Sequence, residues 1–215
     1  IELTKKAFVK YNLQDAWNRV VAVVVQPGVE FGDEVVFDYD RNKSRELTDV
    51  IENYPNIVYE AHSTDYQKKE LLKQMVEDHF GFLKVGPWLT FAFREAVFAL
   101  ALIEKELLSS KRGIILSNLL EVVDERMINF PKYWEQYYDF SEQENKLKRK
   151  YSYSDRIRYY WADNIVNESL QRLILNLTEN KVPQGVLSEN PEEIILHKIS
   201  NVLEIYNFAT YGGVN

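Results

Sequence analysis

Three short apolar runs, each followed by a helical pattern, set the strongest limit on what this chain can fold into. The first run covers residues 20–25, with five valines and one alanine, and it ends at Gln26-Pro27-Gly28. Because polar residues do not alternate with apolar ones, we expect both of its faces to be buried, as in a parallel sheet. Residues 57–62 and 82–86 form the second and third predicted strands. Strands that alternate with helices predict a parallel sheet with right-handed crossovers.

Apolar residues at helical spacing predict the remaining elements. Thr64 and Gln67 have the spacing of a capping box at the start of one helix, and Asn190 with Pro191 marks the start of the last one. Residues 131–161 are aromatic and charged and show no clear pattern. The predicted helices cover residues 4–18, 44–54, 64–80, 90–110, 113–129, 164–178 and 191–208.

The strand count is too small for a closed α/β domain. Three strands leave two open edges, and a complete eight-stranded barrel needs roughly 250 residues. About half of the 215 residues follow the last strand as helix. The pattern therefore predicts the C-terminal part of a larger α/β domain, followed by helices.

Composition and charge exclude several classes of protein. The chain has no cysteine, which excludes a disulfide scaffold, a thiolate nucleophile and a cysteine zinc site. Its net charge of -7 argues against a general nucleic-acid binder. The sequence has no apolar run long enough for a membrane span and no export signal at residues 1–6, so we expect a cytoplasmic protein.

Polar residues stand at the carboxyl ends of all three predicted strands. In a parallel α/β sheet these ends meet at one edge and carry the site. Glu60 and His62 are two residues apart on one strand and point the same way, while Lys84 is a charge on a short apolar strand. These three are the candidate catalytic residues, as acid, base or ligand groups. The candidate substrate-binding residues are Gln26, Ser63, Thr64 and Gly86.

Two other interpretations of these strand ends stay open. The cluster could be a structural polar network in which Lys84 pairs with Glu60. As a metal site, Glu60 and His62 are incomplete and need a ligand from elsewhere. The backbone after the second and third strands could also bind phosphate, although Asp65 in the first turn of the predicted helix argues against an anion there.

Residues 146–150 and 154–161 form a basic and aromatic cluster. It could be a phosphate or partner surface, but a solvated loop leading into a packed aromatic helix fits the pattern better. Nucleotide motifs are missing from the sequence. Gly81 and Gly86 have the glycine spacing of a P-loop, but Pro87-Trp88 stand where Lys and Ser or Thr are required.

Four segments resemble one known family, in order and over essentially the whole chain. They are RVVAVVVQPGVEF from residue 19, VYEAHSTDYQ from residue 58, LKVGPWLTFAFREAVFAL from residue 83 and YSYSDRIRYYW from residue 151. Together they are similar to the Z-type, so-called non-catalytic, subunit of class II D-tagatose-1,6-bisphosphate aldolase.

This resemblance implies strands six to eight of a TIM (β/α)₈ barrel over residues 1–110 and a helical extension over residues 111–215. It also implies a role in galactitol, N-acetylgalactosamine and tagatose breakdown. There the subunit supports a separate catalytic subunit, which carries zinc and cleaves tagatose 1,6-bisphosphate to glycerone phosphate and glyceraldehyde 3-phosphate. No cofactor is implied for this chain.

Two functional hypotheses follow. In the first, the chain is an accessory part of an aldolase, a lyase, and is not catalytic alone; its partners are the catalytic subunit, a sugar phosphate or a second copy, but not nucleic acid or membrane. In the second, it is an enzyme acting on sugar phosphates through Glu60, His62 and Lys84. That enzyme would be an aldolase, or the tagatose-6-phosphate kinase of older family labels.

Overall fold

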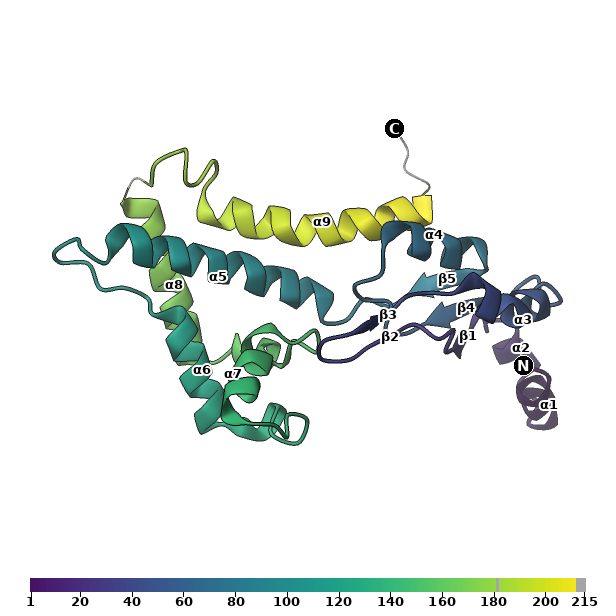
Figure 1. Cartoon of the computed structure of the whole chain (residues 1–215). Helices are drawn as coiled ribbons and strands as arrows, with labels where there is room; N and C mark the ends of the chain where they lie inside the picture. Colours follow the sequence, from purple (N-terminus) through teal and green to yellow (C-terminus); the bar gives the residue numbers. More distant parts are fainter. Residues whose placement is uncertain (181, 212–215) are drawn as a thin grey trace. The chain divides into compact units, whose positions relative to one another are not determined.

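The structure is a computed structural model, and it describes residues 1–180 and 182–211. Within these residues the chain forms two compact units. Among the described residues, the strand unit contains residues 1–31, 36–86 and 205–211, and the helical unit contains residues 32–35, 87–180 and 182–204. Figure 1 labels the elements along the chain. No helix of the described residues is long and apolar enough to cross a membrane.

The strand unit is built on a parallel sheet of three strands in the order β1-β4-β5, as predicted. These strands are β1 (Ala22–Val25), β4 (Val58–Ala61) and β5 (Phe80–Leu83). Helices α3 (Arg41–Ile51) and α4 (Lys69–Glu77) supply the crossovers. The fold is therefore α/β with a parallel sheet, and its third strand begins two residues earlier than predicted.

Within the described residues, helices cover only one face of the sheet. Tyr59, Ala61 and Phe80 pack into the core with residues of α3 and α4. On the other face Val24, Glu60 and Phe82 are register partners, and Val24 and Phe82 are 56% and 47% exposed. The expectation that both faces of residues 20–25 are buried is therefore wrong for this structure, because helices lie on one side of the sheet and β1 is an edge strand.

Gly81 lies in β5 close to the neighbouring strand β4. The β4–β5 pairing shifts register between Tyr59 and Glu60. A Cβ atom on Gly81 would lie 2.8 Å from Cγ2 of Val58, closer than such atoms approach in folded proteins. The position therefore requires glycine because of the neighbouring strand.

Two local predictions in the strand unit are wrong. Residues 4–18 form two helices, α1 (Glu2–Lys10) and α2 (Gln14–Trp17), because Asn12 between them adopts a left-handed backbone with φ 56°. The capping box at Thr64 and Gln67 does not form, since α4 begins at Lys69.

Instead, the Gln67 side chain satisfies the backbone beside a hairpin that the sequence did not predict, β2 (Glu30–Phe31) with β3 (Val36–Phe37). Its Oε1 accepts from Tyr39 N at 2.9 Å, and its Nε2 donates to Phe37 O at 2.9 Å. The buried Gln67 amide therefore satisfies one backbone donor and one backbone acceptor, and it is not available to cap a helix.

The helical unit is formed by long helices around an apolar core. The core contains Val97 and Leu100 of α5, Leu119 and Val123 of α6, and Leu173 of α8. Asn190 Oδ1 accepts from Glu193 N at 2.9 Å, which confirms the predicted cap of α9. Residues 205–211 of α9 belong to the strand unit. The helices are α5 (Trp88–Leu108), α6 (Leu119–Asn129), η1 (Pro131–Tyr133), α7 (Glu142–Tyr151), η2 (Arg156–Tyr160), α8 (Asn164–Glu179) and α9 (Pro191–Tyr211).

The basic run at residues 146–150 is not the predicted solvated loop. It lies in α7, which starts with a capping box formed by Ser141 and Glu144. The Arg149 side chain is fully buried and donates to Asp124 at 2.7 Å and to Glu142 at 2.9 Å. The carboxylates that neutralise this arginine come from α6 and from the first turn of α7, so the run alone could not reveal them.

Candidate functional site

The structure brings Glu60, His62 and Lys84 together at the carboxyl ends of β4 and β5. Oε1 of Glu60 lies 2.6 Å from Nζ of Lys84 and 3.0 Å from Nε2 of His62. Lys84 reaches Glu60 because its backbone N–H donates to Ala61 O at 3.0 Å, which extends the β4–β5 pairing beyond the strand. One carboxylate oxygen therefore holds both basic side chains.

The electrostatics of this cluster favour an ionised Glu60. Hydrogen bonds from Lys84 and then from His62 lower the pKa of its carboxyl group. Glu60 is 19% exposed, whereas the side chains of His62 and Lys84 are 52% and 56% exposed. The two basic groups can thus reach a ligand from solvent, while the carboxylate beneath them fixes their positions.

Gln26 has a different partner. It follows β1, and its Nε2 donates to Oε2 of Glu30 at 3.3 Å. Oε1 of Glu30 in turn accepts from the backbone N–H of Phe31 at 3.0 Å. Glu30 therefore orients the Gln26 amide, and the sequence did not predict this role for Glu30.

The loop after β4 is tied to the segment after β5. Thr64 is fully buried, and its hydroxyl donates to Lys84 O at 2.8 Å. Oδ1 of Asp65 accepts from the Gly86 N–H at 2.8 Å. Thr64 and Gly86 thus take part in bonds that hold the Lys84 backbone in place, and Ser63 in the same loop adopts a left-handed backbone with φ 55°.

Tyr206 completes this loop from the far end of the sequence. Its hydroxyl donates to Thr64 O at 3.0 Å, and burial raises its pKa, so it remains a neutral donor. No local sequence signal pairs a tyrosine of the last helix with a threonine after β4. The contact therefore could not be predicted from the sequence.

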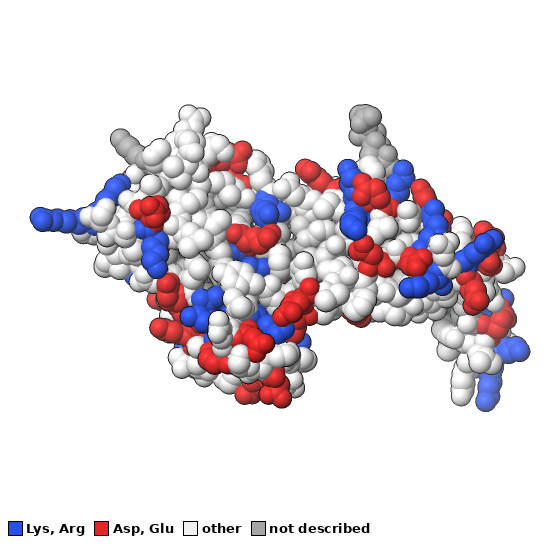
Figure 2. All heavy atoms as spheres, in the orientation of Figure 1, with Lys and Arg blue, Asp and Glu red and all other residues white. Residues whose placement is uncertain are grey.

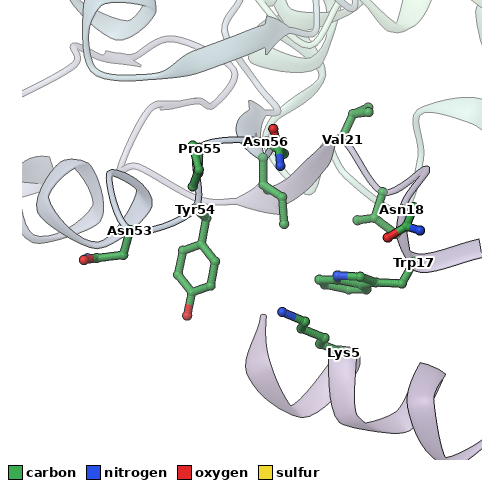
Figure 3. A pocket seen from close by; sticks show the side chains of 10 residues that line it. Lys5, Trp17, Asn18, Val21, Asn53, Tyr54, Pro55 and Asn56 are labelled. Carbon is green, nitrogen blue, oxygen red and sulfur yellow. The ribbon is translucent and has the colours of Figure 1, made fainter. Parts of the chain in front are cut away.

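A cavity of about 690 Å³ lies at the opposite end of the strands, where β1 and β4 begin. Figure 3 shows the rings of Trp17 and Tyr54 at this cavity together with Lys5. None of the predicted site residues lines it. Since parallel sheets place their sites at the carboxyl ends of strands, the Glu60 cluster is the better candidate site.

Metal binding needs more ligands than this cluster supplies. Within residues 1–180 and 182–211, no group of three His, Asp or Glu side chains is placed to hold a metal ion. Glu60 and His62 supply two ligand groups, whereas a protein zinc site uses three or four. These residues alone do not fit zinc.

Comparison with known proteins identifies the family. Residues 1–211 match the family described as D-tagatose-1,6-bisphosphate aldolase subunit GatZ/KbaZ-like. The crystal structure of a probable tagatose 6 phosphate kinase from Sinorhizobium meliloti 1021 is similar, with a TM-score of 0.88 and 37% sequence identity. The similarity covers 95% of this chain and 56% of that protein, so this chain spans little more than half of that relative. The chain therefore belongs to the D-tagatose-1,6-bisphosphate aldolase subunit GatZ/KbaZ-like family, as its four sequence segments predict.

Proposed function

We propose that this chain is part of an accessory subunit that supports the activity and stability of a catalytic D-tagatose-1,6-bisphosphate aldolase subunit. The observation that carries this proposal is the family match over residues 1–211. The partner would hold the zinc ion and cleave the bisphosphate to glycerone phosphate and glyceraldehyde 3-phosphate. The proposed setting is the cytoplasmic breakdown of tagatose, galactitol and N-acetylgalactosamine.

We also propose that β1, β4 and β5 are strands six to eight of a (β/α)₈ barrel. The sheet has two unpaired edge strands among the described residues, and its helices cover one face. In a barrel the uncovered face, with Val24, Glu60 and Phe82, would point inward, and the edges would pair with other strands. The division into a barrel segment and a helical extension near residue 110 belongs to the same proposal.

The Glu60 cluster supports a second candidate function, catalysis by this chain itself. Glu60, His62 and Lys84 would act as acid, base or ligand groups on a sugar phosphate, with Gln26 and Ser63 as polar contacts. The observation in favour is that two exposed basic groups share one carboxylate at the strand ends. Thr64 and Gly86 would serve this site through the backbone they hold.

Two conservative substitutions separate support from catalysis. Glu60→Gln and His62→Asn keep size and polarity, so the fold and the partner complex should remain intact. If the chain only supports its partner, the aldolase rate of the complex should stay within about 2–3-fold of wild type, because general acid–base groups contribute roughly 10²–10⁴-fold. A loss of about a hundredfold, with the partner still bound, would instead assign catalysis to this chain.

A matched control checks that a change in the aldolase rate is specific to the Glu60 cluster. Glu52→Gln removes an exposed carboxylate that lies 3.9 Å from His79, outside the site. It should leave both the rate and the half-life of the complex unchanged. If Glu52→Gln reduced the rate as much as Glu60→Gln, the effect would be one of general charge and would not support a catalytic Glu60.

A further inference from the structure

A group of exposed tyrosines with an exposed lysine and two half-buried arginines lies on η1, η2 and the turn between η1 and α7. Tyr133, Tyr137 and Tyr159 are 39%, 48% and 43% exposed. Large aromatic side chains exposed together are characteristic of binding surfaces rather than of ordinary protein surface. We call this group the tyrosine–cation surface, and it consists of Lys132, Tyr133, Tyr137, Arg156, Arg158 and Tyr159.

Contacts within the surface hold its side chains in place. The rings of Tyr133 and Tyr159 stack with centroids 5.0 Å apart. The guanidinium of Arg156 lies 3.1 Å from the Tyr137 ring centroid, and it also donates to Tyr133 O at 3.1 Å. Because these side chains are already ordered, binding would cost little side-chain entropy.

The Arg158 side chain orders the other edge of this surface. Its Cζ lies 4.4 Å from the Tyr159 ring centroid, and its Nη2 donates to the Tyr159 hydroxyl at 2.8 Å. It also donates to the carbonyl of Asp155 at 3.1 Å. The hydrogen bonds of Arg158 therefore go to neutral groups, while the negative charge that faces it is the buried carboxylate of Asp155, whose pKa the arginine acts to lower.

The charge of the surface points to its partner. Other cations of the same region are neutralised inside the helical unit, since Lys148 pairs with Glu34 at 2.8 Å and Arg126 with Asp163 at 2.5 Å. Among the described residues, the ion pairs include none made by Lys132, Arg156 or Arg158. Three cations that make no ion pair among the described residues therefore lie beside tyrosine rings, on a chain of net charge -7.

We infer that the tyrosine–cation surface docks onto a folded protein whose surface carries Asp or Glu side chains around an apolar patch. This inference rests on the proposed function, under which that protein is the catalytic aldolase subunit. Tyrosine and arginine are the residue types that contribute most binding energy at protein interfaces, and complementary charge speeds association.

Nucleic acid fits this surface less well. A nucleic-acid footprint is a broad basic field. Glu135 and Asp139 are exposed on the same segment as Tyr133 and Tyr137. On the face drawn in Figure 2, acidic and basic side chains are interspersed. The observations therefore favour a protein partner.

The test measures affinity of the intact protein for a purified catalytic subunit. The charge variant Lys132→Glu with Arg158→Glu should weaken binding at least about tenfold and reduce the salt dependence of the association rate. Tyr159→Ala should also weaken binding at least about tenfold, while Tyr159→Phe, which keeps the ring, should stay within about threefold of wild type. Thermal unfolding would verify that each variant is folded.

The chain supplies a matched control. Lys10 lies 5.6 Å from the Tyr11 ring centroid, much as Lys132 lies 5.4 Å from that of Tyr133, and Tyr11 is 67% exposed. Lys10→Glu with Tyr11→Ala removes a comparable exposed pair in the strand unit and should leave the affinity unchanged.

The outcomes separate the inference from the proposed function. If the wild type binds and the surface variants bind equally well, the inference is wrong and the accessory function stands. If the wild type does not bind the catalytic subunit, the accessory function fails and this inference fails with it. Loss of self-association or of oligonucleotide binding in the same variants, without loss of the aldolase complex, would also overturn the inference in favour of that other partner.

Discussion

Nζ of Lys84 lies 2.6 Å from Oε1 of Glu60, so the ends of neighbouring strands β4 and β5 are joined by an ion pair. This contact confirms the prediction that the ends of the two parallel strands place Lys84 beside Glu60. Lys84 is more than half exposed, so solvent screens the pair and its contribution to stability is modest. Its main effect is on the protonation of Glu60.

Lys84→Met should raise the pKa of Glu60. The lysine is the largest cause of its lowered pKa, and His62 would preserve a smaller part of that effect. Because the folded-state pKa lies below the unfolded one, the pair stabilises the protein above the ordinary carboxyl pKa, and this stability is lost as pH falls through the lowered value. A carboxyl NMR titration measures the shift.

Lys68→Met is a suitable control for that titration. It breaks another exposed ion pair, in which Nζ of Lys68 lies 2.7 Å from Oδ2 of Asp38. This pair has no contact with Glu60. The Glu60 pKa should be the same in this variant as in the wild type. An unchanged Glu60 pKa in Lys84→Met would contradict the role assigned to the pair.

Gly81→Ala should destabilise the strand unit by about 1–3 kcal/mol, the usual cost of overpacking. The added methyl group would meet Cγ2 of Val58 at 2.8 Å. Val58→Ala combined with Gly81→Ala should recover part of the loss, since it removes the clashing methyl groups. Urea unfolding of the single and double variants measures the coupling, and simple additivity would be evidence against the clash.

Asp155→Asn should cost the helical unit about 3–5 kcal/mol, because it leaves a buried arginine without its counter-charge. Oδ1 of Asp155 lies 3.2 Å from Nε of Arg94, and both side chains are almost completely buried. Asp139→Asn, at an exposed position, is the control and should change the unfolding free energy by less than about 0.5 kcal/mol. A similarly small loss in Asp155→Asn would show that Arg94 is stabilised by other groups.

Residues 1–215 expressed alone should self-associate through the open edge and uncovered face of the sheet. Val24 lies there on edge strand β1 and is 56% exposed. Val24→Lys should shift the protein toward monomer in sedimentation velocity, because a lysine opposes edge-to-edge pairing. Val35→Lys alters an equally exposed valine outside the sheet and should have no such effect. A monomeric wild type would disprove this prediction.

The parts of the fold that the sequence predicts are those with short-range signals. The apolar run before Pro27 predicts a strand of a parallel sheet, although not that one of its faces is exposed, and the positions of Glu60 and Lys84 at strand ends predict their meeting. Asn190 before Pro191 predicts a helix start that the structure confirms. Each of these signals is local, because a periodic pattern, a helix cap or the end of a strand is recognised from a few consecutive residues.

The missed parts depend on partners far away in the sequence. Gln67 has the spacing of a capping residue, yet it bonds the backbone at Phe37 and Tyr39. Arg149 lies in a run that suggests solvent exposure, yet it is buried against Asp124. Buried polar groups of this kind form hydrogen bonds with whichever donor or acceptor the fold brings near them, and the linear sequence does not show which one that is.

The last turns of α9 carry a consequence for how the protein is made. Ala209 is part of the core of the strand unit, and Tyr206 donates to Thr64 in the loop after β4. Chains emerge from the ribosome from the N-terminus onward, and a domain folds once its parts are available. The sheet strands are synthesised before the helical unit, but their core remains incomplete until residues 205–211 have been synthesised. During translation the apolar surface of this unit is therefore exposed while the whole helical unit is being made.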